Sequence, residues 1–195
     1  MIKRISLFVL AFMLISITGV TLVYYINPYD LKTDNIRPRV FGFDIYKIPS
    51  KSMQPILIPG DVITVSSLSY IQKKPQRNDV IIFYLTEKNK LEKRVQYIKR
   101  VVAIGGDSIQ LKNGKLFINQ NSVNENYVSQ SNNKTPYSLK MTQITVPENH
   151  VFVLGDNRDN SADSRMFGTI PVGDVFAKAS RILYGINNRS GNEIK

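Results

Sequence analysis

The sequence predicts a mainly β protein, in which one N-terminal transmembrane helix precedes an antiparallel β-sheet or barrel-like domain. Three observations predict this class. An uncharged run of 22 residues, Ile5–Ile26, lies near the start of the 195-residue chain. From residue 45 onward, short segments are rich in β-branched and aromatic residues, as strands are. Asn113-Gly114 separates two such segments, and this pair favours a hairpin because both of its residues adopt positive φ.

The apolar run is long enough to cross a bilayer as a helix. At about 1.5 Å per residue it matches the roughly 30 Å hydrocarbon core. Tyr24 and Tyr25 close the run, where interfacial aromatic residues are enriched, and Asn27-Pro28 follows. A cleaved signal peptide has a shorter apolar core and ends at a small-x-small site, so we expect a retained anchor. Basic residues flank both ends of the run, so charge alone leaves its orientation open.

The rest of the chain divides by composition. We expect an anchor at 1–26, a polar connector at 27–44, a β-rich domain at 45–186 and a tail at 187–195. The predicted strands, which share β-branched or alternating composition, are 61–65, 79–85, 107–111, 115–118, 151–154 and 177–184. The Asn-Gly hairpin and the polar stretch after it predict a hairpin and flap insertion at about 108–145.

Composition excludes several classes of site. The chain has no cysteine, which excludes disulfides, thiol nucleophiles and cysteine-ligated metals. His150 is the only histidine, so a zinc site built from several histidines is excluded as well. The formal charge of +11 suits nucleic acid or anionic lipid, but the basic residues are scattered. We interpret them as a solvated basic surface and expect no nucleic-acid partner.

A candidate nucleophile and two candidate bases can be named from the residues. Ser52 lies in a segment between Pro49 and Pro55, and prolines make such a segment stiff. A serine hydroxyl needs a base to remove its proton. His150 is one candidate, as part of a Ser/His/Asp triad. Lys99 is the other, because apolar strand neighbours can dry its amine, although a strand lysine usually faces water.

A densely charged loop follows the predicted strand at 151–154. Residues 155–165 read Gly-Asp-Asn-Arg-Asp-Asn-Ser-Ala-Asp-Ser-Arg, which is typical of a hydrogen-bonded, salt-bridged network. Asp156, Asp159 and Asp163 could alternatively be oxygen ligands of calcium. The two arginines inside the loop argue against a cation there.

Together these stretches resemble type I signal peptidases, a family of membrane-bound Ser/Lys proteases. Residues 52–57, Ser-Met-Gln-Pro-Ile-Leu, resemble the family's nucleophile motif, Ser-Met-x-Pro-Thr-Leu, and 60–65 resemble the strand motif after it. Residues 97–102, Tyr-Ile-Lys-Arg-Val-Val, resemble the lysine motif, and 155–165 resemble the last motif. The likeness runs in order from the anchor to about Tyr184.

The resemblance implies a role for each matching residue. Ser52 is expected to attack the scissile carbonyl, Lys99 to act as general base, and Ser161 to orient the lysine amine. Ser50 is expected to form the oxyanion hole with the Ser52 backbone N–H, and Asp163 with Arg165 a supporting ion pair. The residues expected to line two shallow substrate pockets are Tyr46, Ile48, Met53, Leu57, Tyr97 and Ile98.

The resemblance also implies a setting for the reaction. Substrates would be signal peptides of secretory preproteins with Ala-x-Ala-like cleavage sites, and no metal or cofactor is implied. The protein would be a single-pass protein of the plasma or inner membrane, in contact with the lipid bilayer, with its catalytic domain on the extracytoplasmic face. Two departures from the motifs are Ile56, in place of the usual threonine, and Lys51, between the two serines.

Three alternatives stay open at this point. A specialised peptidase of the same dyad class, for example one that processes a conjugative pilin, would share every motif. A self-cleaving repressor-type Ser/Lys protein would lack the anchor and the last motif. A non-catalytic, membrane-tethered basic module that binds lipid or nucleic acid would function without Ser52.

Overall fold

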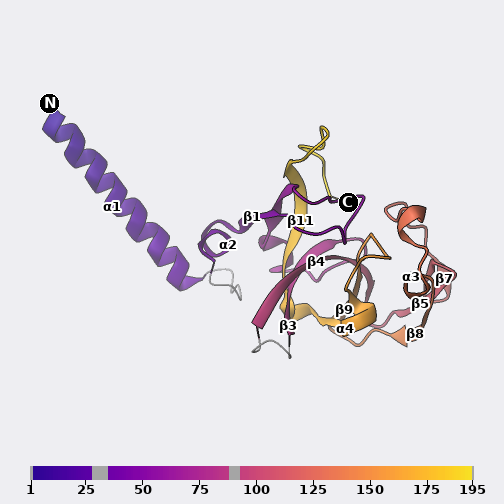
Figure 1. Ribbon diagram of the computed structural model, residues 1–195. Helices are drawn as coiled ribbons and strands as arrows, with labels where there is room; N and C mark the ends of the chain where they lie inside the picture. The colour runs from indigo at the N-terminus through magenta and orange to yellow at the C-terminus, as the bar shows by residue number, and fades with distance from the viewer. Residues whose placement is uncertain (1, 28–34, 88–92, 195) are drawn as a thin grey trace.

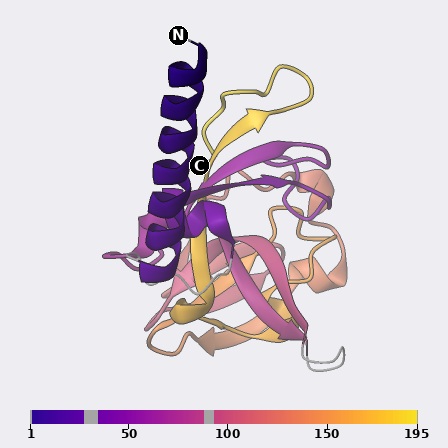
Figure 2. The same ribbon diagram turned by 90° about the vertical axis from the view of Figure 1, so that its left-hand side faces the viewer.

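The computed structural model of the chain describes residues 2–27, 35–87 and 93–194. Its N-terminal element, α1 (Ile2–Ile26), is one straight helix (Figures 1 and 2). The stretch Val9–Ile26 is apolar and long enough to cross a membrane, and none of it is buried against the rest of the described chain. The apolar helix predicted at this place is confirmed, while its insertion into a bilayer stays a prediction.

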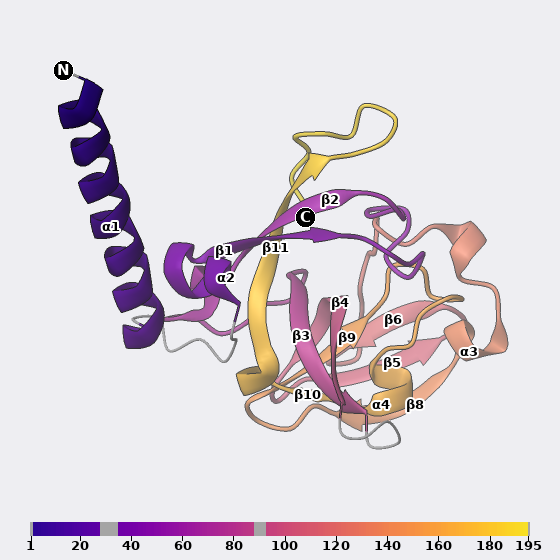
Figure 3. The ribbon, with the colours of Figure 1, turned by 60° about the vertical axis from the view of Figure 1, so that its left-hand side comes forward.

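Eleven strands in two sheets make up the described part of the β domain. In the larger sheet all neighbouring strands run antiparallel. Its strands, in spatial order, are β1 (Phe43–Lys47), β2 (Val62–Ser66), β11 (Val175–Tyr184), β3 (Val80–Glu87), β4 (Lys93–Ile104), β9 (His150–Leu154) and β10 (Ile170–Pro171). Figure 3 shows β3, β4 and β9 next to one another. The predicted mainly β, antiparallel class is confirmed.

The smaller sheet is built from the chain between β4 and β9. Its strands, in spatial order, are β7 (Asn121–Ser122), β6 (Lys115–Ile118), β5 (Ser108–Lys112) and β8 (Met141–Thr145). The described short helices are α2 (Ile36–Phe41), η1 (Leu68–Tyr70), η2 (Gln130–Asn132), α3 (Pro136–Leu139), α4 (Ser164–Phe167) and η3 (Val172–Asp174). The insertion expected at about 108–145 as a hairpin and flap thus consists of four strands with η2 and α3 between them.

The segment expected as a polar connector, 27–44, contains regular structure in its described part. The helix α2 ends at Gly42, whose φ of 74° is left-handed and whose N–H donates to the Pro38 carbonyl. A side chain at Gly42 would also collide with Leu68. The chain therefore turns at this glycine and enters β1 at Phe43, two residues before the expected start of the β domain.

The alternation of side chains along β3 explains how one sheet contacts two cores. Val80 and Ile82 lie in one buried cluster, whereas Ile81 and Phe83 lie in another, as the two-residue period of a strand requires. A central strand of this kind buries side chains on both faces, which is why 80–85 reads Val-Ile-Ile-Phe-Tyr-Leu without alternation. In its partner β4, residues 99–103 are buried while Gln96 is exposed, so the second half of β4 runs through the interior of the domain.

Candidate active site

Ser52 lies in a tight turn between β1 and β2. The Gln54 N–H donates to the Lys51 carbonyl at 3.1 Å, and the Leu57 N–H donates to the Met53 carbonyl at 2.9 Å. From across the domain, Asn157 holds the start of the turn: its N–H donates to the Ser52 carbonyl and its side-chain amide to the Lys51 carbonyl, each at 3.1 Å. The backbone that carries Ser52 is therefore bonded on both sides.

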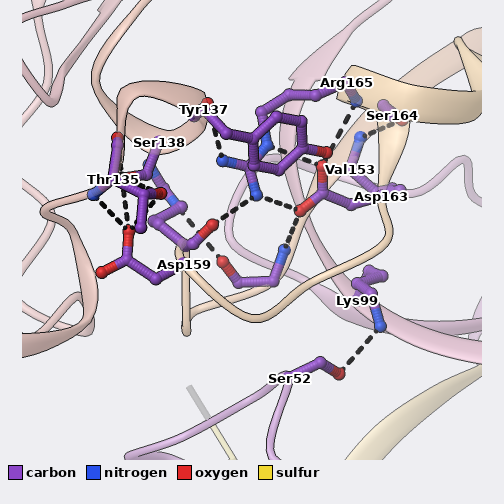
Figure 4. A network of polar contacts seen from close by, with 12 residues as sticks. Ser52, Lys99, Thr135, Tyr137, Ser138, Val153, Asp159, Asp163, Ser164 and Arg165 are labelled. Atoms are coloured by element: carbon purple, nitrogen blue, oxygen red, sulfur yellow. Dashed lines mark hydrogen bonds and ion pairs between the residues drawn. The ribbon is translucent and has the colours of Figure 1, made fainter.

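Lys99 projects from the buried strand β4 toward this turn. Its Nζ lies 3.0 Å from Ser52 Oγ and donates to the Ile98 carbonyl at 2.8 Å (Figure 4). On β3 the residue opposite Lys99 is Ile81, which is fully buried. The apolar neighbours that the sequence predicts for this amine are thus side chains of the central strands of the larger sheet.

Burial is the main influence on the Lys99 amine. The side chain is only 4% exposed, and the loss of solvation lowers its pKa from 10.5 to about 8. The carboxylates of Asp163 and Asp156 act in the opposite direction, because a nearby negative charge favours the ammonium form. The net result is an amine with a substantial neutral fraction near pH 8.

The loop after β9 brings its polar groups beside the pair. Leu154, the last residue of β9, is opposite Arg100, so the loop begins next to Lys99. Asp163 and Arg165 form a two-pronged ion pair with N–O distances of 2.7 and 2.8 Å, and Asp163 also accepts the Gly155 N–H at 3.0 Å (Figure 4). The ion pair therefore fixes the start of the loop at the point where it passes Lys99.

The two further serines have different surroundings. Ser50 Oγ lies 3.2 Å from Ser52 Oγ, within hydrogen-bond distance, and its expected role in the oxyanion hole stays a prediction. Ser161 Oγ is buried against Gly155 and has no hydrogen-bond partner among the described residues. A hydrogen bond from Ser161 to the Lys99 amine, expected from the resemblance, is not formed in this structure.

The comparisons with known proteins agree with one another. A family described as signal peptidase, peptidase S26, matches residues 2–184. The chain belongs to this family. Among its relatives, signal peptidase I of Leptolyngbya laminosa is 33% identical over 76% of this chain and 72% of that protein. Signal peptidase I of Bacillus caldolyticus is 34% identical over 72% of this chain and 79% of that protein. Thylakoidal processing peptidase 1 of Arabidopsis thaliana is 36% identical over 68% of this chain, which spans 39% of the plant protein.

The signal peptidase family is one of serine peptidases, so the chain is a hydrolase whose class removes signal peptides.

The described residues assemble neither the Ser/His/Asp triad nor the calcium site that the sequence left open. His150 begins β9, at the end opposite the loop, and its Nδ1 lies 3.0 Å from the Glu148 carbonyl O. The carboxylates weighed as calcium ligands have separate partners: Asp156 contacts Arg100, Asp163 contacts Arg165, and Asp159 contacts the segment 134–138.

The residues expected to line the substrate pockets divide between two clusters. Ile48, Met53 and Leu57 are buried in one cluster, with Tyr46 and Ile98 packed at its edge. Tyr97 lies in the other cluster, where its ring stacks on Phe83 with centroids 5.8 Å apart. Since 97 and 98 are consecutive on a strand, their side chains leave opposite faces. The six residues therefore do not line a single surface of this signal peptidase.

Several residues that support the site were missed from the sequence. Arg100 and Asp156 form a fully buried pair with two hydrogen bonds of 2.8 Å, and Arg158 pairs with Glu125 of the insertion at 2.5 Å. Asp159 accepts the backbone N–H groups of Lys134 and Thr135, so that the insertion is tied to the loop (Figure 4). The only signal for Arg100 was a second charge next to Lys99 in an apolar strand, and its partner is 56 positions away.

Gly155→Ala is expected to lower both stability and activity. A Cβ at Gly155 would lie 2.5 Å from the Ser52 carbonyl O and 2.6 Å from Ser161 Cβ, which real Cβ atoms do not approach. The Ser52 carbonyl cannot move aside without shifting the backbone of the nucleophile, so we expect kcat to fall by at least about tenfold. Thermal unfolding and steady-state cleavage measure the two effects. Gly19→Ala in α1, where nothing lies within 4 Å, is the matched control; wild-type values for both variants would contradict the argument.

Proposed function

We propose that the chain is a membrane-anchored endopeptidase that removes signal peptides from exported preproteins through a Ser52/Lys99 dyad. The observation that carries this proposal is the 3.0 Å approach of the Lys99 amine to the Ser52 hydroxyl inside a nearly dry site. An amine can accept a proton only when it is neutral, and burial gives Lys99 a substantial neutral fraction near pH 8. A lysine serves here as the base that a serine nucleophile needs.

The reaction follows from these two groups. Lys99 Nζ takes the proton of Ser52 Oγ as the oxygen attacks the scissile carbonyl carbon. The resulting ammonium then gives that proton to the departing amine, which leaves an ester between Ser52 and the signal peptide. Water, deprotonated by the neutral Lys99, hydrolyses the ester and restores the hydroxyl. In each step Lys99 Nζ is the atom that accepts or donates the proton. Its partner is Ser52 Oγ, the departing amine or the attacking water.

The remaining site residues take supporting roles in the proposal. The Ser50 hydroxyl and the Ser52 backbone N–H would donate to the developing oxyanion, as such donors do in other acyl transfers. A rotation of the Ser161 side chain would give its unpartnered hydroxyl a bond to the Lys99 amine. The Asp163–Arg165 ion pair would keep the loop in place during turnover.

Substrate specificity would come from apolar surfaces near Ser52. Ile48, Met53 and Leu57 lie in one buried cluster with Tyr46 and Ile98 at its edge, and this apolar surface would accept small side chains best. This supports cleavage after Ala-x-Ala-like sequences in an extended segment. Tyr97, on the other face of β4, would contribute to a second surface rather than the same one.

The membrane setting is part of the same proposal. The helix α1 would span the membrane once, with the catalytic domain on the extracytoplasmic face, where exported preproteins emerge. Ile36, Phe41 and Phe43, which follow the anchor, expose 59%, 55% and 45% of their surface and would contact lipid. Confinement of enzyme and substrate to one bilayer would raise their effective concentration.

Cleavage of preproteins by the full chain in phospholipid vesicles tests the proposal. We expect cleavage of several unrelated secretory preproteins behind a small-x-small site, with the new N-terminus identified by mass spectrometry. Ser52→Ala should produce no cleavage. If the wild-type chain cleaves none of the panel, the proposal fails. Cleavage of a pilin precursor alone would instead support the specialised peptidase.

A further inference from the structure

The segment after β11 folds back onto the domain as a hook, which we define as residues 185–194. Figure 2 shows it as the yellow loop that extends past β11. It lies beyond residues 2–184, which the family model matches. The Ile182 N–H donates to the Asn192 carbonyl at 2.9 Å and the Ile194 N–H to the Ser180 carbonyl at 3.1 Å. Ile194 is 6% exposed and lies in the same cluster as Met53, so the described part of the segment predicted as a tail packs against the domain.

Arg189 in the hook contacts the far side of the nucleophile turn. Its Nη2 donates to the Ile56 carbonyl and lies 3.4 Å from the Pro55 carbonyl O. Its Nη1 lies 3.0 Å from Asp61 Oδ2. The contact with Asp61 is an ion pair without hydrogen-bond alignment, since Nη1 has no hydrogen-bond partner among the described residues. One guanidinium therefore joins the middle of the turn to its end.

Asp61 transmits this contact to the backbone of the turn. It is fully buried, and the same Oδ2 that faces Arg189 accepts the Ile58 N–H at 2.9 Å. A buried carboxylate is costly unless a positive charge and hydrogen bonds compensate it. Within the described residues, Arg189 is the cation that pairs with Asp61. Loss of Arg189 would leave this carboxylate to find a new position.

We propose that Arg189 is a positioning residue, which holds the second half of the nucleophile turn as Asn157 holds the first. Asn157 bonds the carbonyls of Lys51 and Ser52, and Arg189 bonds those of Pro55 and Ile56. The first clamp bonds Ser52 itself and the second begins three residues later, so the Ser52 hydroxyl keeps its distance from Lys99 only while both hold. This inference rests on the proposed function, because it assumes that Ser52 is the nucleophile.

Steady-state cleavage by Arg189→Met, in the full chain in vesicles, tests the inference. We expect kcat to fall by about 10- to 100-fold, since a displacement of about 1 Å can cost that much. KM should change much less than kcat, because Tyr46 on β1 and Ile98 on β4, which would contact the substrate, lie outside the displaced turn. The pH midpoint of the rate should also stay the same, because Arg189 does not contact Lys99. Arg189→Lys should recover part of the rate, since a lysine replaces the charge but not the fork.

Arg181→Met is the matched control. Arg181 is 58% exposed and lies 3.7 Å from Glu193 of the hook, so its loss removes an ion pair of the hook without touching the turn. We expect its kcat to equal that of the wild type.

Two further variants keep the test decisive. If Arg189→Met does not fold, Asp61→Asn/Arg189→Met removes both charges of the ion pair but keeps an acceptor for the Ile58 N–H, and its kcat should still be low. A wild-type kcat in whichever variant folds, or an equal fall in Arg181→Met, would overturn the inference. An active Ser52→Ala would instead refute the proposed function, so the two failures are distinguishable.

Discussion

Lys99→Met is expected to lose at least about 10³-fold in kcat while the protein stays folded. A positioned general base contributes about 10²- to 10⁴-fold, and here the same group also protonates the leaving amine. Methionine has nearly the length of lysine and no charge, so it should fill the buried position beside Ile81 without opening a cavity. Cleavage assays and circular dichroism together separate loss of chemistry from loss of structure.

Lys51→Met is the matched control for this variant. Lys51 precedes the nucleophile directly, but its side chain is exposed to solvent. We expect the control to cleave at close to the wild-type rate. If Lys99→Met retained more than about a tenth of the wild-type kcat, another base would have to be present and the dyad would be wrong.

Lys99→Met should also change how the free energy of unfolding depends on pH. Lowering the Lys99 pKa from 10.5 to about 8 corresponds to about 3 kcal/mol of penalty for burying the ammonium form. Between those pH values the unfolded chain holds a proton that the folded chain has lost, so wild-type stability rises with pH in this window. Lys99→Met has no such group. Its stability relative to wild type should therefore be highest below pH 8 and decline toward pH 10.5.

The second large effect is on the pH–rate profile. The neutral amine is the active form, so kcat/KM should rise with pH and reach half of its plateau near pH 8, the pKa of the free Lys99. Between pH 6 and pH 8 this is a rise of about 50-fold, as a single titration requires. A flat profile from pH 6 to 10 would show that no such group controls the rate.

Asp163→Asn gives this profile an internal check. The Asp163 carboxylate raises the Lys99 pKa, so its removal should move the midpoint to lower pH. The unpaired Arg165 would act in the same direction, because a positive charge disfavours the ammonium form. A midpoint that moves to higher pH would contradict the electrostatic account.

Local pattern predicted much of the fold. The N-terminal apolar helix, the strand at 80–85 and the Asn113-Gly114 hairpin are each readable because composition or turn chemistry specifies them within a few residues. The helix α2 was missed because its six residues are too few to show a helical period. It ends at Gly42, which packs so closely against the Leu68 side chain that no Cβ would fit there. The hook was missed because its attachment depends on contacts with distant segments.

The sequence predicted which residue types form the candidate site, but not the ion pairs and hydrogen bonds that hold them in place. Ser52 and Lys99 were recognised through motifs, although they are 47 positions apart and nothing local requires them to meet. The strand register that brings them together depends on the whole sheet. Partners such as Asp61 with Arg189 and Arg100 with Asp156 lie far apart in sequence, so a single sequence does not reveal them.

A direct titration of the Lys99 amine tests the central claim, that burial lowers the pKa of this group beside Ser52. The full chain with ¹³C-labelled lysine, in detergent micelles, allows each side-chain amine to be followed by NMR, and the resonance missing from Lys99→Met identifies the one of interest. The account predicts a pKa of about 8 for that resonance. A pKa of about 10.4, that of a solvated lysine, would contradict it.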